Sequence, residues 1–221
     1  IILMKIALVF GSSGLVGNQL INLLIKSTDY YKVKLFVRSP IKFDNTKIEV
    51  IRTDFHNLSN HTDDIQGDDC FYCIGTTKKN SPDKSEYKRV ELEIPKEIAQ
   101  ISKLNSVKTF TFISSGYANP KHSGDYLRYK GLVEEELKKL KFDKLGILRP
   151  SFLIGDREES RIGEKIGIII FKILSPIFLG PLKKMKPIQA LIVAKAMLNI
   201  SRNDLTKNTF ESNEIVELSK I

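Results

Sequence analysis

The fold is decided by a stretch near the amino terminus, residues 6–17, which reads IALVFGSSGLVG. Its first half is a short, continuously apolar run, which is typical of a strand buried in a parallel sheet. Its second half places three glycines in the spacing G-x-x-G-x-x-G, directly before an amphipathic segment. Glycines allow a sharp turn and let backbone amides approach a pyrophosphate, and the amino end of the following helix attracts that negative charge. The stretch therefore predicts a strand, a phosphate-binding loop and a helix.

Outward from this stretch, short apolar segments alternate with longer amphipathic ones. Strands are predicted at residues 4–10, 32–37, 48–52, 69–74, 107–114 and 143–149, and helices at 15–28, 84–104 and 126–141. Such alternation is typical of right-handed βαβ units. The sequence thus predicts an α/β fold with a Rossmann-type doubly wound parallel sheet, in a single domain over residues 1–221. The core should span about 1–155, and about 156–221, with a last helix near 188–200, should form a small C-terminal lobe on the substrate side.

The composition fits one globular domain and excludes several classes of protein. Of the 221 residues, 42% are hydrophobic and 28% are charged, which argues against intrinsic disorder, collagen and a coiled coil. The formal net charge of +9 is concentrated, because residues 165–210 contain eight basic and one acidic side chain. Since the predicted core carries little excess charge and no nucleic-acid-binding motif, nucleic acid is not expected as a partner.

Two cysteines, Cys70 and Cys73, are spaced C-x-x-C, a pattern found in redox pairs and metal sites. They lie in a predicted strand, where three steps span about 10 Å, beyond the roughly 7 Å between Cα atoms that a disulfide tolerates. We therefore expect two reduced thiols on opposite faces of the sheet. The three histidines show no metal-ligand spacing, so no metal is expected. Reduced thiols without an evident targeting segment predict a cytoplasmic location.

An arginine follows the second predicted strand, where the adenosine ribose of a dinucleotide should lie. Chains that bind NAD usually carry Asp or Glu there, about 20 residues beyond the glycines. This chain has Arg38 in that place, and the nearest acid is Asp44. An arginine fork suits a 2′-phosphate. The sequence therefore predicts NADP(H) rather than NAD(H) as the cofactor, with an ordinary solvated arginine as the alternative.

Other cofactor contacts are predicted at strand carboxyl ends, where ligands bind in open α/β sheets. The turn after the third strand should meet the adenine, and the turn after the fourth should let backbone pass close to the cofactor. The predicted cofactor-binding residues are Gly11, Ser12, Ser13, Gly14, Leu15, Val16, Gly17, Arg38, Asp54, Phe55, Cys73, Ile74, Gly75, Thr76, Ser114, Tyr126 and Lys130.

A serine, a tyrosine and a lysine form the candidate catalytic set. Ser115 lies at the end of the fifth predicted strand, and Tyr126 and Lys130 follow at i and i+4 on one face of the next helix. A free tyrosine has a pKa of about 10, and a nearby ammonium lowers that pKa by stabilising the phenolate. Ser115 would hold the reacting oxygen, Tyr126 would move its proton, and Lys130 would also hold the nicotinamide ribose. An unrelated pair on a helix surface is the alternative.

This order of motifs resembles the short-chain dehydrogenase/reductase superfamily, in its extended or atypical division. Further stretches are similar to its Tat-interacting-protein-like oxidoreductase branch: CIGTT at 73–77, YLRYKG at 126–131, KFD at 141–143, LRP at 148–150 and DREESR at 156–161. The resemblance implies a Rossmann fold, NADPH binding and catalytic positions for Ser115, Tyr126 and Lys130. It also implies that the segment after the sixth strand lies by the nicotinamide. That segment comprises Pro150, Ser151, Phe152 and Leu153.

The chain departs from the family pattern in one helix. Many extended members carry an asparagine early in the helix that follows the fourth strand, whereas this chain has Val90 and Glu91 near that place. The resemblance therefore does not supply a proton-relay role for this helix.

These features together predict an NADPH-dependent oxidoreductase that moves a hydride to or from a small carbonyl or alcohol. The substrate is expected to be a small molecule, with apolar and anionic compounds as the leading classes. Two alternatives remain open at this point: an NADPH-sensing scaffold protein with little turnover, and an enzyme resembling a nucleotide-sugar epimerase. A natural substrate cannot be assigned from the resemblance.

A very apolar segment at 166–180 is interrupted by Lys172 and Pro176 and is shorter than the 18 or so residues of a membrane span. No transmembrane span is expected. The favoured interpretation is that it closes a substrate pocket or forms the face of a homodimer. The other interpretation is a peripheral contact with anionic lipid through the lysines at 183, 184 and 186.

Overall fold

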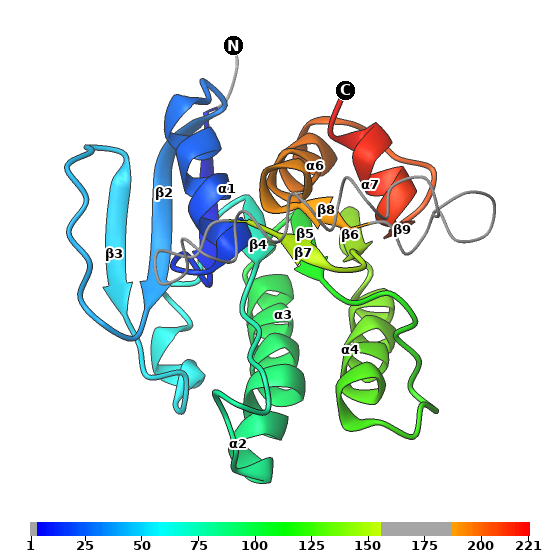
Figure 1. Cartoon of the computed structure of the whole chain (residues 1–221). Coiled ribbons are helices and arrows are strands. Elements are labelled where there is room, and N and C mark those ends of the chain that lie inside the picture. Colours follow the sequence, from blue (N-terminus) through cyan, green and yellow to red (C-terminus); the bar gives the residue numbers. More distant parts are fainter. Residues whose placement is uncertain (1–3, 156–186) are drawn as a thin grey trace.

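The structure is a computed structural model that describes residues 4–155 and 187–221 (Figure 1). The main strands are β1 (Lys5–Phe10), β2 (Tyr30–Val37), β3 (Ile48–Arg52), β4 (Asp69–Tyr72), β5 (Thr109–Ile113), β6 (Lys144–Arg149) and β9 (Thr209–Glu211). They form one 7-stranded sheet in the order β3-β2-β1-β4-β5-β6-β9, and every pairing is parallel. The predicted Rossmann-type doubly wound sheet is confirmed.

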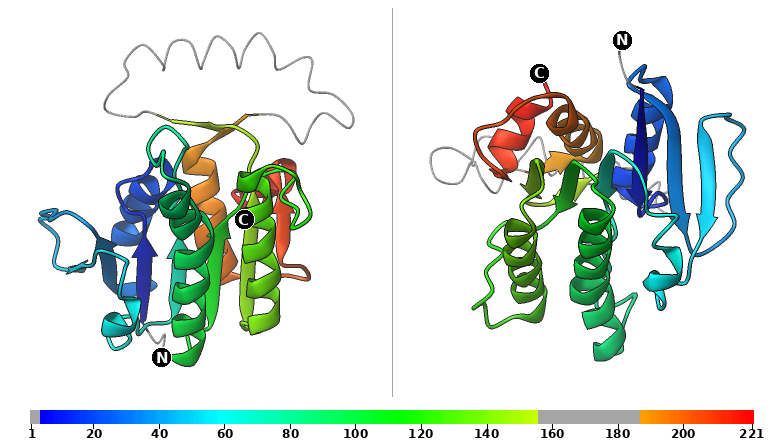
Figure 2. Two further views of the ribbon diagram at one scale, coloured as in Figure 1. Left: turned by 90° about the horizontal axis from the view of Figure 1, so that it is seen from below. Right: turned by 180° about the vertical axis from the view of Figure 1, so that it is seen from behind.

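The described helices cover both faces of this sheet (Figures 1 and 2). They are α1 (Leu15–Lys26), α2 (Lys84–Lys88), α3 (Ile94–Leu104), α4 (Asp125–Leu140), α6 (Ala190–Arg202) and α7 (Ser212–Leu218). One apolar cluster joins α1, α6 and α7 to the sheet and contains Leu20, Val193 and Ile215. A second cluster joins α3 and α4 to the other face and contains Ile98 and Val133.

The strand order reverses between β1 and β4, because β2 and β3 lie on one side of β1 and β5, β6 and β9 lie beyond β4. In open α/β sheets a ligand binds at the carboxyl ends of the strands at such a switch point. The glycine loop follows β1 and therefore lies at this point of the sheet.

The helix predicted over 84–104 is continuous but changes its winding. Between α2 and α3 it forms a π-helical turn at Arg89–Glu93, in which Val90, Glu91 and Leu92 are buried. Such turns are rare and often occur at functional sites. A separate 3-10 helix at Leu58–His61 follows β3.

The two cysteines are free and lie on opposite sides of the sheet, as predicted. Cys70 belongs to the cluster beneath α3 and α4, and Cys73 packs against the cluster beneath α1 and α6. Burial raises the pKa of the Cys73 thiol to about 12, so that it is protonated near neutral pH. Among the described residues, no group of His, Cys, Asp and Glu could hold a metal ion.

The described part of the expected C-terminal lobe, residues 187–221, is built into the main fold. β9 extends the central sheet along β6, with Phe210 beside Leu148. Helix α6 packs on α1, and buried residues such as Val193 and Met197 lie in the same apolar cluster as Leu20 of α1. Strand pairing and an apolar helix face therefore draw this segment into the sheet and its helical layer.

Three features of the sequence lie outside the described residues: the family-like stretch at 156–161, the apolar segment at 166–180 and the lysines at 183, 184 and 186. On either side of them, β7 (Leu153–Ile154) and β8 (Ile188–Gln189) pair as a separate 2-stranded parallel sheet. None of the helices in the described ranges has the length and apolar character needed to cross a membrane.

Candidate functional site

The predicted site residues gather at one edge of the sheet because each follows a parallel strand. The residues that directly follow β1, β2, β4, β5 and β6 are Gly11, Arg38, Cys73, Ser114 and Pro150. Helix α4 adds Tyr126 and Lys130 at its amino-terminal end, which approaches the same edge (Figure 2). The tertiary structure thus brings together the glycine loop and the candidate catalytic residues, which are more than 100 residues apart in the chain.

The glycine loop is packed so closely that two of its positions admit only glycine. Gly11 has a φ of +87°, and a Cβ built there would lie 2.6 Å from the carbonyl carbon of Cys73. A Cβ on Gly17 would lie 2.1 Å from the carbonyl oxygen of Gly11. Both distances are far below van der Waals contact, so the missing side chains are what let α1 begin against β1 and β4.

The amino end of α1 is suited to an anion. Gly14 is its N-cap residue, no side chain caps the helix, and its first turn contains no acidic residue. Within the described residues, the positive end of the helix dipole therefore has neither a capping side chain nor a first-turn acid to neutralise it. Ser13 and Gly14 are exposed here, whereas Ser12 and Val16 are buried beneath the loop and Leu15 is half-buried.

Arg38 is exposed directly beyond β2, and the sheet register gives it a neighbour that the sequence did not reveal. Val37 lies beside Arg52, so the two arginines stand at the ends of adjacent strands. Arg52 is also exposed. Its place beside Arg38 depends on the pairing of β2 with β3, which no local sequence pattern specifies.

The turn after β3 is held in place by the π-helical turn. The guanidinium of Arg89 donates a hydrogen bond of 2.6 Å to the carbonyl oxygen of Phe55 and is ion-paired with Glu97. The Phe55 ring is buried, 6.5 Å from the ring of Phe10 in an edge-to-face arrangement. Asp54 is exposed and accepts a hydrogen bond of 2.8 Å from the His56 amide. Of the two predicted adenine contacts, Asp54 is therefore the accessible one, because Phe55 is buried and its amide and carbonyl oxygen are already hydrogen-bonded.

The turn after β4 runs beside the glycine loop. The amide of Cys73 donates to the carbonyl oxygen of Phe10, the last residue of β1, at 2.8 Å. Ile74 is half-buried and Gly75 is exposed. The amide of Thr76 donates to a carboxylate oxygen of Glu91 at 2.6 Å, so this turn is anchored to the π-helical turn.

Lys130 is the best-defined member of the candidate catalytic set. Its side chain is almost fully buried, and its ammonium donates a hydrogen bond of 3.2 Å to the carbonyl oxygen of Ile113 at the end of β5. The same ammonium lies 5.8 Å from the centroid of the Tyr126 ring. Tyr126 itself is 37% exposed, so its phenol is open to a ligand. The structure thus places the predicted tyrosine and lysine together beside the strand that leads to Ser115.

A buried carboxylate faces Lys130, and the sequence analysis missed it. Glu91 lies with a carboxylate oxygen 3.0 Å from the Lys130 ammonium, and its side chain is fully buried. Burial by itself would lower the pKa of Lys130. The charge and hydrogen bond of Glu91, together with the charges of Tyr126 and Glu134, offset this effect, so the pKa of Lys130 lies above its usual 10.5. An acidic residue among the apolar positions of one helix was the available signal, because such a residue needs a buried partner.

The two neighbouring serines have different surroundings. The Ser114 hydroxyl is buried and donates to a carboxylate oxygen of Glu134 at 2.5 Å, and Arg149 is ion-paired with the same carboxylate. Ser115 is half-buried, and the bond that its hydroxyl makes within the described residues is a long one, 3.3 Å to the carbonyl oxygen of Gly116. Ser114 is therefore held in a structural network, whereas Ser115 retains a hydroxyl that can turn toward a ligand.

The segment after β6 forms the remaining wall of the site. Pro150 is buried, and its carbonyl oxygen accepts a hydrogen bond of 3.0 Å from Gly116. The backbone of Ser151 is held by the Ser212 hydroxyl at 2.8 Å. Phe152 is 68% exposed and Leu153 is 37% exposed. This wall therefore presents apolar surface next to Ser115.

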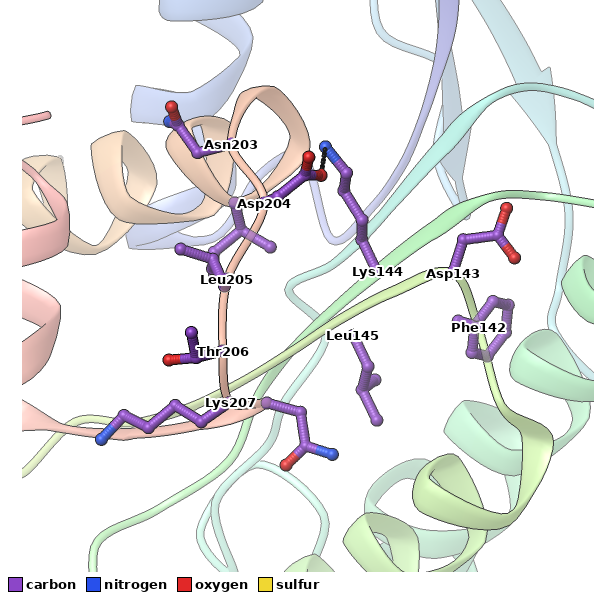
Figure 3. Close-up of a pocket in the computed structure, with 11 residues that line it drawn as sticks. Phe142, Asp143, Lys144, Leu145, Asn203, Asp204, Leu205, Thr206 and Lys207 are labelled. Atoms are coloured by element: carbon purple, nitrogen blue, oxygen red, sulfur yellow. Dashed lines mark ion pairs between the residues drawn. The ribbon is translucent and has the colours of Figure 1, made fainter.

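A cavity of about 380 Å³ lies elsewhere, between the beginning of β6 and the loop after α6 (Figure 3). It contains an ion pair of 3.1 Å between Lys144 and Asp204. Lys144 is the first residue of β6, so the cavity lies at the amino edge of the sheet, opposite the glycine loop. It is not part of the site described above.

Comparison with known proteins decides the family. Residues 11–166 match the NAD(P)H-binding family, and the match contains the glycine loop and every residue of the candidate catalytic set. The chain belongs to the NAD(P)H-binding family. The resemblance inferred from the motifs is confirmed, because the chain is 30% identical over 224 residues to Protein HTATIP2 of Rattus norvegicus, covering 98% of this chain and 90% of that protein.

Solved structures of this family's fold agree with the architecture. The chain superposes on the Bordetella bronchiseptica enzyme WbmH in complex with NAD+ with a TM-score of 0.70 at 17% identity, covering 99% of this chain and 80% of the other. It superposes on a short-chain dehydrogenase/reductase superfamily protein from Agrobacterium tumefaciens with bound NAD with a TM-score of 0.67 at 16% identity, covering 93% and 76%. At such identities the likeness shows the fold alone.

The expected cytoplasmic location is corrected by the fungal relatives. Protein FMP52-1 of Scheffersomyces stipitis is 31% identical over 229 residues, covering 97% of this chain and 98% of that protein, and is named mitochondrial. Further fungal relatives carry the same designation. The cytoplasmic prediction was wrong because free thiols exclude only oxidising compartments and do not distinguish one reducing compartment from another.

Proposed function

We propose that the chain is an NADPH-dependent oxidoreductase that moves a hydride to or from a small carbonyl or alcohol. The single observation that carries this proposal is the buried ammonium of Lys130, bonded to the end of β5 and lying 5.8 Å from the Tyr126 ring. A lysine is costly to bury, and here it lies beside a phenol that can exchange a proton with a bound substrate.

The chain's own residues fit the cofactor. The loop leaves no room for a side chain at Gly11 or Gly17, and in the described part of the chain the amino end of α1 has no capping side chain and no first-turn acid. These are the features that a pyrophosphate needs. Arg38 and Arg52 would bind the 2′-phosphate of NADP(H) at the ends of β2 and β3, and Lys130 would hold the nicotinamide ribose.

The proposed roles follow from what each side chain can donate or accept. When bound, the nicotinamide supplies or accepts the hydride. Ser115 donates a hydrogen bond to the reacting oxygen and orients it. Tyr126 gives its phenolic proton to that oxygen during reduction and takes the proton back during oxidation. The Lys130 ammonium favours the phenolate form, because a nearby positive charge stabilises it. Phe152 and Leu153 would contact an apolar part of the substrate.

Reversing the charge of Arg38 tests the cofactor preference. In Arg38→Glu, NADPH affinity is expected to fall by about 10- to 100-fold, since a hydrogen bond to a charged group is worth about 1.5–3 kcal/mol. NADH affinity should change much less because NADH has no 2′-phosphate. Calorimetric titration with both cofactors measures the two values, and Arg52→Glu tests the second arginine in the same way.

Lys26→Glu is the matched control, because Lys26 is an exposed basic residue at the far end of α1. It should leave both affinities unchanged. Equal losses of NADPH and NADH affinity in Arg38→Glu would contradict the preference for NADP(H).

A substrate screen tests the activity. NADPH consumption is followed over aldehydes, ketones and quinones, and cofactor binding is measured in parallel. Tight NADPH binding with no consumption would favour the NADPH-sensing scaffold instead. A separate arm with uridine-diphosphate sugars tests the epimerase alternative, which the shared fold alone does not support.

A further inference from the structure

The π-helical turn between α2 and α3 buries an acidic side chain. Glu91 is 1% exposed, although it lies on a helix whose neighbouring positions Val90 and Leu92 pack in the apolar core. An ionised carboxylate is costly to bury unless it is paired and hydrogen-bonded. The contacts of Glu91 therefore indicate why the carboxylate is there.

The two oxygens of this carboxylate contact different parts of the candidate site. Oε1 accepts the hydrogen bond of 2.6 Å from the Thr76 amide, in the turn after β4. Oε2 lies 3.0 Å from the Lys130 ammonium on α4. One side chain thus joins the turn beside the glycine loop to the lysine beside Tyr126.

A stabilising role alone does not account for this pair. Two buried charges lose their hydration, and apolar residues of similar volume often replace such a pair at no cost in stability. The pair does keep a charged ammonium at one place, held between the carboxylate and the Ile113 carbonyl oxygen. A proton-transfer site needs such a fixed charge, because a displacement of about 1 Å can reduce a rate about 10²-fold.

We infer that Glu91 is a positioning residue. Its one buried carboxylate fixes the ammonium of Lys130 beside Tyr126 and also fixes the Thr76 amide in the turn after β4. The inference rests on the proposed function for the role of Lys130. Glu91 contacts neither the expected substrate nor the cofactor directly, and it acts through the lysine and the turn. It lies in the helix for which the family resemblance supplied no proton-relay role.

The electrostatics of the pocket support this role. Burial favours the neutral amine of Lys130, and Glu91 is the largest of the groups that oppose this effect, so that the pKa of Lys130 is raised. Tyr126 and Glu134 of α4 are the other titratable groups that act on Lys130. Tyr72 of β4 and Tyr87 of α2 face Glu91 itself, and their own pKa values are raised, first by burial and then by the Glu91 charge. Burial and the Glu91 charge therefore favour the neutral form of both tyrosines.

The test is the protonation of Lys130 in Glu91→Gln. This variant keeps a side-chain oxygen that can accept from Thr76 but removes the negative charge. The protonation of Lys130 is followed by nuclear magnetic resonance of its ε-methylene group while the pH is raised from 6 to 11. The signal is assigned by its absence from the spectrum of Lys130→Arg. In the wild-type chain Lys130 should remain protonated above pH 10. In Glu91→Gln its midpoint should fall by at least one pH unit.

Glu93→Gln is the matched control. Glu93 lies two residues away in the same π-helical turn, but it is 40% exposed and pairs with Lys88 instead. Its substitution should leave the Lys130 midpoint unchanged. A Lys130 midpoint in folded Glu91→Gln equal to that of the wild-type chain would overturn the inference, whatever the change in melting temperature.

A second variant keeps the test decisive if Glu91→Gln does not fold. Glu91→Asp retains the charge but is one methylene shorter, so it cannot reach both partners, and a smaller fall of the Lys130 midpoint is expected. A wild-type midpoint in this variant would also overturn the inference. NADPH titration of the wild-type chain is run alongside: absence of binding would reject the proposed function, whereas binding with an unchanged Lys130 midpoint would reject only the role of Glu91.

Discussion

Turnover by Tyr126→Phe is expected to fall by about 10²–10⁴-fold, the contribution that a positioned general acid or base usually makes. NADPH affinity should remain close to that of the wild-type chain. The variant removes only the phenolic oxygen, and the ring that lies 5.8 Å from the Lys130 ammonium is kept. Since Tyr126 is 37% exposed, the loss of one hydroxyl should also leave the melting temperature unchanged. Steady-state kinetics with a substrate from the screen and calorimetric titration of NADPH measure the two effects.

Tyr129→Phe is the control for this prediction. Tyr129 lies on the same helix, with its ring 6.3 Å from that of Tyr87, and has no predicted part in the reaction. It undergoes the same chemical change and should retain turnover. Undiminished turnover in Tyr126→Phe, or an equal loss in both variants, would refute the role assigned to Tyr126.

The second large effect is expected in the glycine loop. Gly17→Ala places a Cβ 2.1 Å from the carbonyl oxygen of Gly11, so α1 and the loop must move apart. Overpacking of this kind costs about 1–3 kcal/mol, and at this chain length each kcal/mol lowers the melting temperature by about 2–4 °C. We expect a fall of up to about 10 °C and loss of measurable NADPH binding, because the amides of the loop would no longer face the pyrophosphate. Thermal melts and calorimetry check both.

Gly14→Ala separates the close approach from the general effect of losing a glycine. Gly14 has an ordinary φ of −77°, and its Cβ would lie 3.3 Å from the same oxygen, a contact that a small shift relieves. Its melting temperature should change by only about 2–4 °C, the effect of about 1 kcal/mol. Equal stability of Gly17→Ala and the wild-type chain would show that α1 does not begin against the loop.

The carboxyl-terminal region shows where prediction from sequence ended. The strand at Thr209–Glu211 is too short to give a periodic pattern, and it exists because β6 offers it an unpaired edge. Helix α6 was expected, but its apolar face did not indicate that its partner is α1. Long-range pairing decides both features, and a window of neighbouring residues contains no information about it.

The candidate site also contains residues that local sequence patterns reveal and a residue that they do not. Gly11, Gly17, Tyr126 and Lys130 could be found from spacing, because a tight turn and one face of a helix are set by residues close together in the chain. Glu91 could not be found in this way, since its carboxylate becomes part of the site only when the π-helical turn, the turn after β4 and α4 meet.

The sequence by itself determined the α/β alternation, the glycine loop, the family and the tyrosine–lysine pair, because each depends on local periodicity or on a short motif. Only the tertiary structure decided that Arg52 stands beside Arg38, that the last strand and helices complete the central sheet, and that Glu91 holds Lys130. Those features arise from strand register and from the burial of charge, which depend on residues brought together from distant parts of the chain.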